Sequence, residues 1–203
     1  MKQLMFLLTF STFSSIVAAQ VNFPQSPVQT TNASSQAGNN NLFIGASTGN
    51  SNAGFNNSIL GSFAGAQLNA ASDNNTFVGF ESGANTTANN NTFIGARSGF
   101  SNTGSATTGT NNTFIGARCG EFNLTGYSNT FIGTNTGLNN ISGFQNLFIG
   151  MEAGGLSQNQ ASGSSNVFIG HWSGATYTTA SNNIGIGINS ARNLLSGQNN
   201  IFI

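Results

Sequence analysis

The chain has 203 residues, no formal net charge and only 4% charged residues, and this composition excludes several classes of function. It contains no basic stripe that could neutralise phosphates, so we expect no nucleic-acid partner. Eighteen phenylalanines in a chain without net charge also argue against ordinary disorder. Gly, Asn and Thr are abundant while Glu, Lys and Arg are scarce, which disfavours helices.

Residues 1–19 have the pattern of a secretory signal peptide. Lys2 supplies the positive charge, an apolar stretch follows, and Ala18 and Ala19 offer small residues for cleavage. The stretch is too short and too interrupted for a transmembrane helix, so we expect no membrane span in the mature chain. A retained N-terminal anchor is the alternative. Residues 20–40 contain both prolines and little apolar periodicity, which predicts an extended linker or an N-terminal cap.

Residues 41–203 consist of ten copies of one pattern, Asn-x-Phe-Ile-Gly-x-x-small-Gly, of which the ninth is degenerate and the tenth truncated. The first residue of each copy, here called the head asparagine, recurs after 16, 18, 16, 21, 17, 17, 20, 17 and 17 residues. The motif keeps its length and only the segment between motifs stretches, as in stacked coils that accept insertions on one face. Because the last copy stops before its glycine, we expect the repeat domain to be truncated at its C-terminus.

Each copy predicts a short strand at x-Phe-Ile, followed by a glycine that permits a turn and a second glycine that closes another corner. The polar segment between motifs has its own weak strand signal, so we expect two short strands per coil. The fold predicted is all-β, a β-solenoid (β-roll or β-helix) of about ten short coils stacked about 4.8 Å apart. The positions expected to carry this structure are Asn75, Phe77, Gly79, Asn91, Phe93, Ile94, Gly95, Asn112, Phe114, Ile115, Gly116, Asn129, Phe131, Ile132 and Gly133.

Three further rows of the aligned copies lead to specific expectations. The residue before the second glycine is always small, so this row should line a tight interior, with Cys119 as a buried structural thiol. The row before it accepts any side chain and should face solvent, where Glu81 and Arg97 can pair across adjacent coils. The head asparagines could form a hydrogen-bonded ladder or support the turn before the strand in a left-handed conformation. The sequence does not choose between these two roles.

The Phe and Ile positions are neighbours and therefore point to opposite faces of the strand, yet both stay apolar. A strand with one wet face would alternate apolar and polar residues. One face of the strand should line the interior of the coil, and the other apolar face should be covered by another part of the protein or by another chain. We therefore predict a homo-oligomer, with a trimer favoured. The alternative is that flanking loops or a flattened coil cover the second face.

The NTFIG segments, with a glycine four positions on, resemble repeats in the heads of trimeric autotransporter adhesins (YadA-like). They are more similar to NTFIG arrays in bacterial surface proteins related to phage tail fibres. This resemblance covers residues 41–203 and implies a β-roll or β-helix, often trimeric, that acts in attachment. The chain departs from these families in its longer repeat and in lacking a coiled-coil stalk, an anchor barrel and a C-terminal chaperone domain. The localisation implied is secreted or on a bacterial cell surface.

Residues for catalysis do not converge in the sequence. His171 is the only histidine and lacks a clustered carboxylate, so we expect it to be an exposed surface residue and the protein not to be an enzyme. A calcium-binding roll needs regular aspartates, but the chain has only Asp73. We therefore expect no metal and no cofactor.

These observations favour a secreted or cell-surface structural and adhesive module that attaches through its extended surface to a cell or a glycan. A self-assembling extracellular fibre, resembling a functional amyloid of a biofilm, is the alternative, because uncharged Asn-rich repeats suit cross-β stacking. An ice-binding solenoid ranks third, because hydroxyl groups recur on one row over only a few coils. The hydroxyl groups of this row belong to Thr76, Thr92, Thr113 and Thr130.

Overall fold

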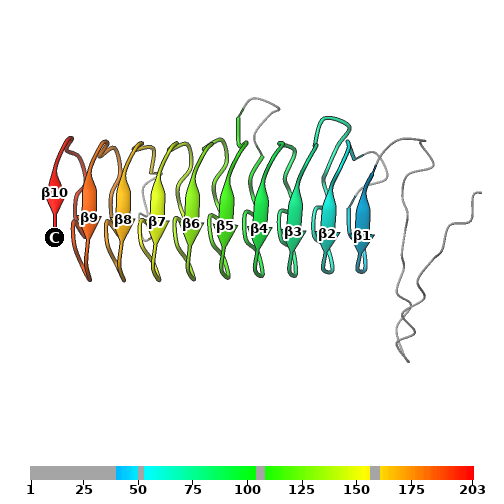
Figure 1. Cartoon of the computed structure of the whole chain (residues 1–203), viewed down its shortest axis with the longest axis horizontal. Coiled ribbons are helices and arrows are strands. Elements are labelled where there is room, and N and C mark those ends of the chain that lie inside the picture. The colour runs from blue at the N-terminus through cyan, green and yellow to red at the C-terminus, as the bar shows by residue number, and fades with distance from the viewer. Residues whose placement is uncertain (1–39, 50–52, 104–107, 156–160) are drawn as a thin grey trace, which may run out of the picture.

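The computed structural model describes residues 40–49, 53–103, 108–155 and 161–203. The predicted signal peptide, and the linker apart from Asn40, lie outside the described residues. Ten short strands lie side by side in one row (Figure 1). Their bounds are β1 Leu42–Ile44, β2 Ser58–Leu60, β3 Thr76–Val78, β4 Thr92–Ile94, β5 Thr113–Ile115, β6 Thr130–Ile132, β7 Leu147–Ile149, β8 Val167–Ile169, β9 Ile184–Ile186 and β10 Ile201–Phe202.

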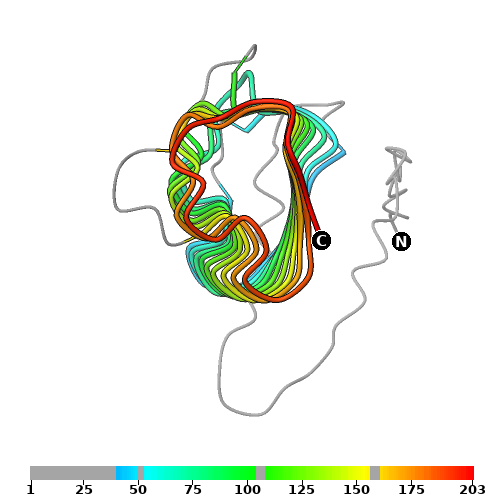
Figure 2. The same cartoon turned by 90° about the vertical axis from the view of Figure 1, so that its left-hand side faces the viewer.

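The predicted all-β solenoid is confirmed. The ten strands form one parallel sheet in sequence order, each paired in register with the same motif position of the next copy. Viewed along the stack, successive coils superpose as closed loops with all the strands on one side (Figure 2). None of the described residues lies in a helix, so none of them forms an apolar helix that could cross a membrane.

The expectation of two strands per coil is wrong for the described residues. Each coil contributes one strand to the sheet, and the polar segments make only isolated bridges, as between Asn140 and Ala161. At the glycines of these segments the backbones of neighbouring coils lie too close together to admit a side chain. A Cβ on Gly126 would lie 2.4 Å from the carbonyl oxygen of Gly143 in the next coil. The segments therefore turn instead of extending.

The head asparagines form a ladder, which is one of the two roles that the sequence allowed. Each head backbone N–H donates to the Oδ1 of the preceding head asparagine, as Asn129 does to Asn112 at 3.0 Å. In most copies its Nδ2 donates to a carbonyl near the end of its own coil, as Asn129 does to Gly143 at 2.8 Å. One buried amide thus ties a coil to its neighbour and also closes the coil. The left-handed conformation belongs to the residue before the head, such as Ser128 at φ 55°.

The phenylalanines of the motif form a continuous stack inside the coils. From Phe77 to Phe168 the six rings are fully buried, and adjacent ring centroids lie 4.8 to 5.2 Å apart. This spacing matches the predicted coil separation. Burying one such ring contributes about 1.5–3 kcal/mol, so this row supplies most of the apolar core.

The row of small residues lines the interior as predicted. Its serine hydroxyls donate to the carbonyl oxygen of the central strand residue in the next coil, as Ser98 does to Phe114 at 3.1 Å. The threonine hydroxyls donate instead to the glycine that follows the next strand, as Thr136 does to Gly150 at 2.5 Å. Cys119 makes the same contact through its thiol, 3.3 Å from the carbonyl oxygen of Phe131. Serine and cysteine are therefore equivalent here, and the buried alanines Ala64 and Ala153 show that small size is the shared requirement of the row.

The second glycine of the motif is required by the phenylalanine ring. Gly99 has φ 59°, and a Cβ there would lie 2.3 Å from the ring of Phe93. In the ninth copy Gly185 replaces the phenylalanine and Ala191, at φ 51°, replaces the glycine. A Cβ built on Gly185 would lie 3.2 Å from that of Ala191, so the alanine methyl lies beside the space that a ring would occupy. The two departures from the repeat are therefore one compensated change.

A second row of asparagines was not predicted. Asn140 donates to Asn123 at 2.8 Å, and Asn123 donates to Asn102 at 2.9 Å, all three being buried. The hydroxyl of buried Tyr177 donates to the Oδ1 of Asn140 at 2.5 Å. This shorter ladder braces the wall of the coil that follows the second glycine.

Replacing Gly99 with Ala should destabilise the protein by about 2–5 kcal/mol, through left-handed strain plus overlap with a buried ring. The matched control is Ala191→Gly, which removes a methyl from a left-handed position that faces no ring; it should be neutral or stabilise by up to about 1 kcal/mol. Urea unfolding followed by circular dichroism measures both. Equal effects of the two variants would contradict the proposed packing.

Candidate functional site

The outward side of the parallel sheet, here called the outer face, is the most extended regular surface among the described residues. It consists of two rows, because the first and third residues of every strand point away from the buried central residue. The first row is Leu42, Ser58, Thr76, Thr92, Thr113, Thr130, Leu147, Val167, Ile184 and Ile201. The second row is Ile44, Leu60, Val78, Ile94, Ile115, Ile132, Ile149, Ile169 and Ile186.

The outer face remains open within the described part of the chain. Ile94, Ile115 and Ile132 keep 38%, 37% and 36% of their surfaces exposed, whereas the phenylalanine beside each of them is fully buried. No described loop folds over these strands, so flanking loops do not supply the second cover there. An extended apolar patch of this kind marks an interaction surface.

The outer face is also uncharged and carries unused hydroxyl groups. None of the ten strands contains Asp, Glu, Lys, Arg or His. The hydroxyls of Thr92 and Thr113 are half-buried and donate to no group in the described residues. Each hydroxyl can therefore donate to, and accept from, a ligand or ordered water.

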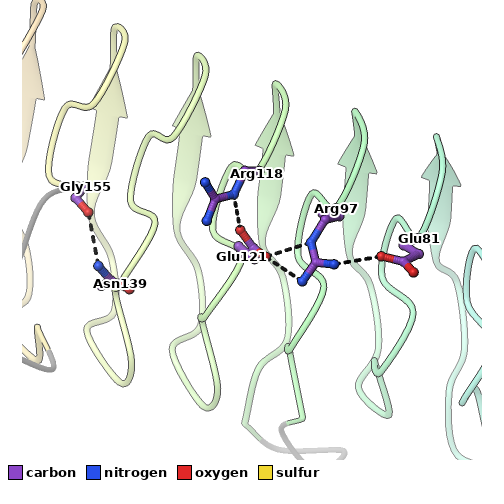
Figure 3. Close-up of polar contacts among 6 residues, drawn as sticks. All are labelled: Glu81, Arg97, Arg118, Glu121, Asn139 and Gly155. Carbon is purple, nitrogen blue, oxygen red and sulfur yellow. Dashed lines mark hydrogen bonds and ion pairs between the residues drawn. The ribbon is translucent and has the colours of Figure 1, made fainter. Parts of the chain in front are cut away.

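Charged residues gather instead on the turns, where Arg97 and Glu121 are central (Figure 3). Arg97 lies 2.9 Å from Glu81 and 2.7 Å from Glu121, so the pairing of Arg97 with Glu81 that the sequence allowed is present. Glu121 also accepts from Arg118 at 2.5 Å and is only 2% exposed. The two arginines balance the two carboxylates, so this cluster links three coils without presenting net charge.

The alignment of the repeats did not predict that Glu121 belongs to this cluster, because Glu121 follows the second glycine of its copy and lies outside the motif. The row that contains Arg97 was expected to face solvent, and the structure places its members between half-buried and exposed. Leaving Glu121 unpaired inside the protein would be costly. The two arginines therefore act as structural partners of a buried carboxylate, and we assign them no ligand.

His171 is half-buried, so the expectation of an exposed histidine is wrong. Its ring centroid lies 4.2 Å from that of Trp172, and Arg192 lies 4.5 Å over the tryptophan ring. The indole N–H of Trp172 donates to Glu152. The tryptophan's size and its stacked partners shield the histidine, which the sequence pattern did not reveal.

The described chemistry-bearing groups are dispersed over the solenoid. Among the described residues, no three His, Cys, Asp or Glu side chains lie close enough together to hold a metal ion. Asp73 accepts from the backbone N–H of Phe55 at 2.7 Å and thereby supports a turn. Cys119 is fully buried, and burial raises the pKa of its thiol well above its usual range.

The Cys119 thiol should not react with a disulfide reagent such as DTNB at pH 8 in the folded protein. Its raised pKa keeps it protonated at that pH, and the thiolate is the reactive species. After unfolding in guanidinium, one thiol per chain should react rapidly with the reagent. A Cys119→Ser variant should keep the contact to the next coil and match the wild-type stability. Rapid labelling of the folded protein would contradict the interior placement.

Comparison of the chain with models of known protein families, with curated proteins and with solved structures found no match. The outer face is therefore identified as the candidate site from its own geometry: ten in-register strands, two rows of uncharged side chains and no cover from the described loops.

Proposed function

We propose that this protein is a secreted or cell-surface structural and adhesive module that attaches through the extended surface of its solenoid. The observation that carries the proposal is the open outer face, in which half-exposed aliphatic residues continue over ten paired strands. Regular extended surfaces of this kind suit binding in stacked-repeat proteins. The resemblance of the NTFIG motif to bacterial attachment proteins supports the same function.

A homo-oligomer, with a trimer favoured, is the competing proposal for what covers the outer face. Parallel sheets usually have both faces covered, and here the chain's described loops leave one face open. Packing three copies around their outer faces would bury the isoleucine row and leave the turns and the Asn-rich corners outside. In that arrangement the attachment surface would be the remaining walls of the coil.

Adsorption of the purified full chain to bacterial cells, host cells and immobilised glycans tests the proposed attachment. We expect saturable binding to at least one of these surfaces. The same chain unfolded in urea provides the control, because attachment through an ordered surface requires the folded solenoid. Equal retention of the folded and unfolded chains, or no retention on any surface, would contradict the proposal.

Light scattering coupled to size exclusion tests the oligomer separately. A stable trimer would assign the outer face to subunit packing. A monomer would leave the outer face free for another ligand and would overturn the trimer without affecting attachment. A growing polymer would favour the extracellular fibre.

A further inference from the structure

The outer face contains a periodic array of hydroxyl and methyl groups in its middle strands. Successive threonines of β3 to β6 are direct Cα partners, as Thr92 and Thr113 are, and so are the branched aliphatic residues two positions on. The buried phenylalanines of the same strands repeat every 4.8 to 4.9 Å. Along a strand the two rows lie about 6.6–6.8 Å apart. The array therefore repeats in two dimensions.

This array is held rigidly from behind. The threonine and isoleucine side chains are β-branched and have few rotamers. Their backbones are fixed by the sheet, by the head asparagines and by the ring stack. A surface that is already ordered loses little entropy when it binds. It can therefore match another ordered surface without rearrangement.

A third ordered row borders the array. The exposed residue Asn74 donates from Nδ2 to the Oδ1 of Asn90 at 3.1 Å, and Asn56 donates to Asn74 at 3.1 Å. Asn56, Asn74 and Asn90 lie two residues before Ser58, Thr76 and Thr92. They add hydrogen-bonding groups beside β2 to β4, whereas Asn111, before β5, donates to Thr110 instead.

We propose that the outer face binds ice, with the threonine row and the neighbouring isoleucine row as the contact surface. Methyl groups restrict the orientations of first-shell water, while the hydroxyls between them offer a donor and acceptors at regular intervals. Together they can hold water in repeating positions that merge with a crystal lattice. This inference rests on the proposed attachment function and names its target. It requires an outer face free of a second copy, so a stable trimer packed through this face would overturn it.

Two features of the outer face favour ice over other solids. Its strands carry no charged residue that would keep its own hydration shell or pair with a mineral ion. They also present no outward aromatic ring, since the central phenylalanines of β1 and of β3 to β8 are buried, whereas the apolar faces of sugar rings pack on aromatic side chains. Where threonine gives way to Leu147, Val167 or Ile184, the row loses its hydroxyl but keeps its apolar groups.

The test is thermal hysteresis and ice-affinity partition of the full chain, compared with a Thr113→Tyr variant. Tyrosine suits strands, so this variant should fold, and its ring should lift the array away from the crystal. The matched control is Thr125→Tyr, in the same coil but outside the sheet, where Thr125 is exposed. Circular dichroism and melting curves establish that all three proteins are folded.

We expect the wild type and Thr125→Tyr to show equal hysteresis and to enter the ice fraction, and Thr113→Tyr to lose both activities severalfold. Absence of hysteresis and of ice partition in the wild type would overturn the inference, as would equal activity of the two variants. Binding to cells or glycans without binding to ice would reject ice alone and leave attachment standing. Binding to no surface would reject both.

Discussion

The buried amide of the head asparagine is the interaction on which the rest of the structure depends. It accepts from the backbone of the next coil and donates to the end of its own coil, as in Asn112, whose Nδ2 lies 2.9 Å from the carbonyl of Gly126. These bonds set the register of every strand. Register in turn brings like residues above one another, so that the rings stack inside and the threonines align outside. An unsatisfied buried amide costs about 1–3 kcal/mol, which makes slipped registers unfavourable.

This constraint explains how an almost uncharged chain without disulfides can fold. Each coil forms hydrogen bonds with its neighbour, and from Phe77 to Phe168 each ring stacks on the ring of the next coil. Variation is confined to segments outside these rows. Between Asn91 and Asn112, where the coil is longest, the Nδ2 of Asn91 has no partner among the described residues, and Gly109 accepts at 2.7 Å from Asn102. The second asparagine row thus takes over closure where the first cannot supply it.

The strand positions could be predicted from the sequence because one motif recurs ten times, and each x-Phe-Ile segment is a strand. The inward row with Cys119 followed from its uniformly small residues. The single strand per coil could not be predicted, because Gly126 and Gly143 lie in segments with a weak strand signal and could simply mark turns between strands. Only the close approach of the next coil shows why these positions are glycine. The cluster around Glu121 and the burial of His171 depend on contacts between unequal coils, which a repeat alignment averages out.

Native-state hydrogen exchange would test the asparagine ladder most directly. The backbone amides of head asparagines such as Asn112, Asn129 and Asn166 should be among the most protected in the protein, because each donates to a buried side chain. An Asn112→Asp variant keeps the acceptor but loses the donor to Gly126, so it should speed exchange in the adjoining coils while distant coils change less. Exchange of the head amides at the rate of an unfolded chain would contradict the ladder and the register derived from it.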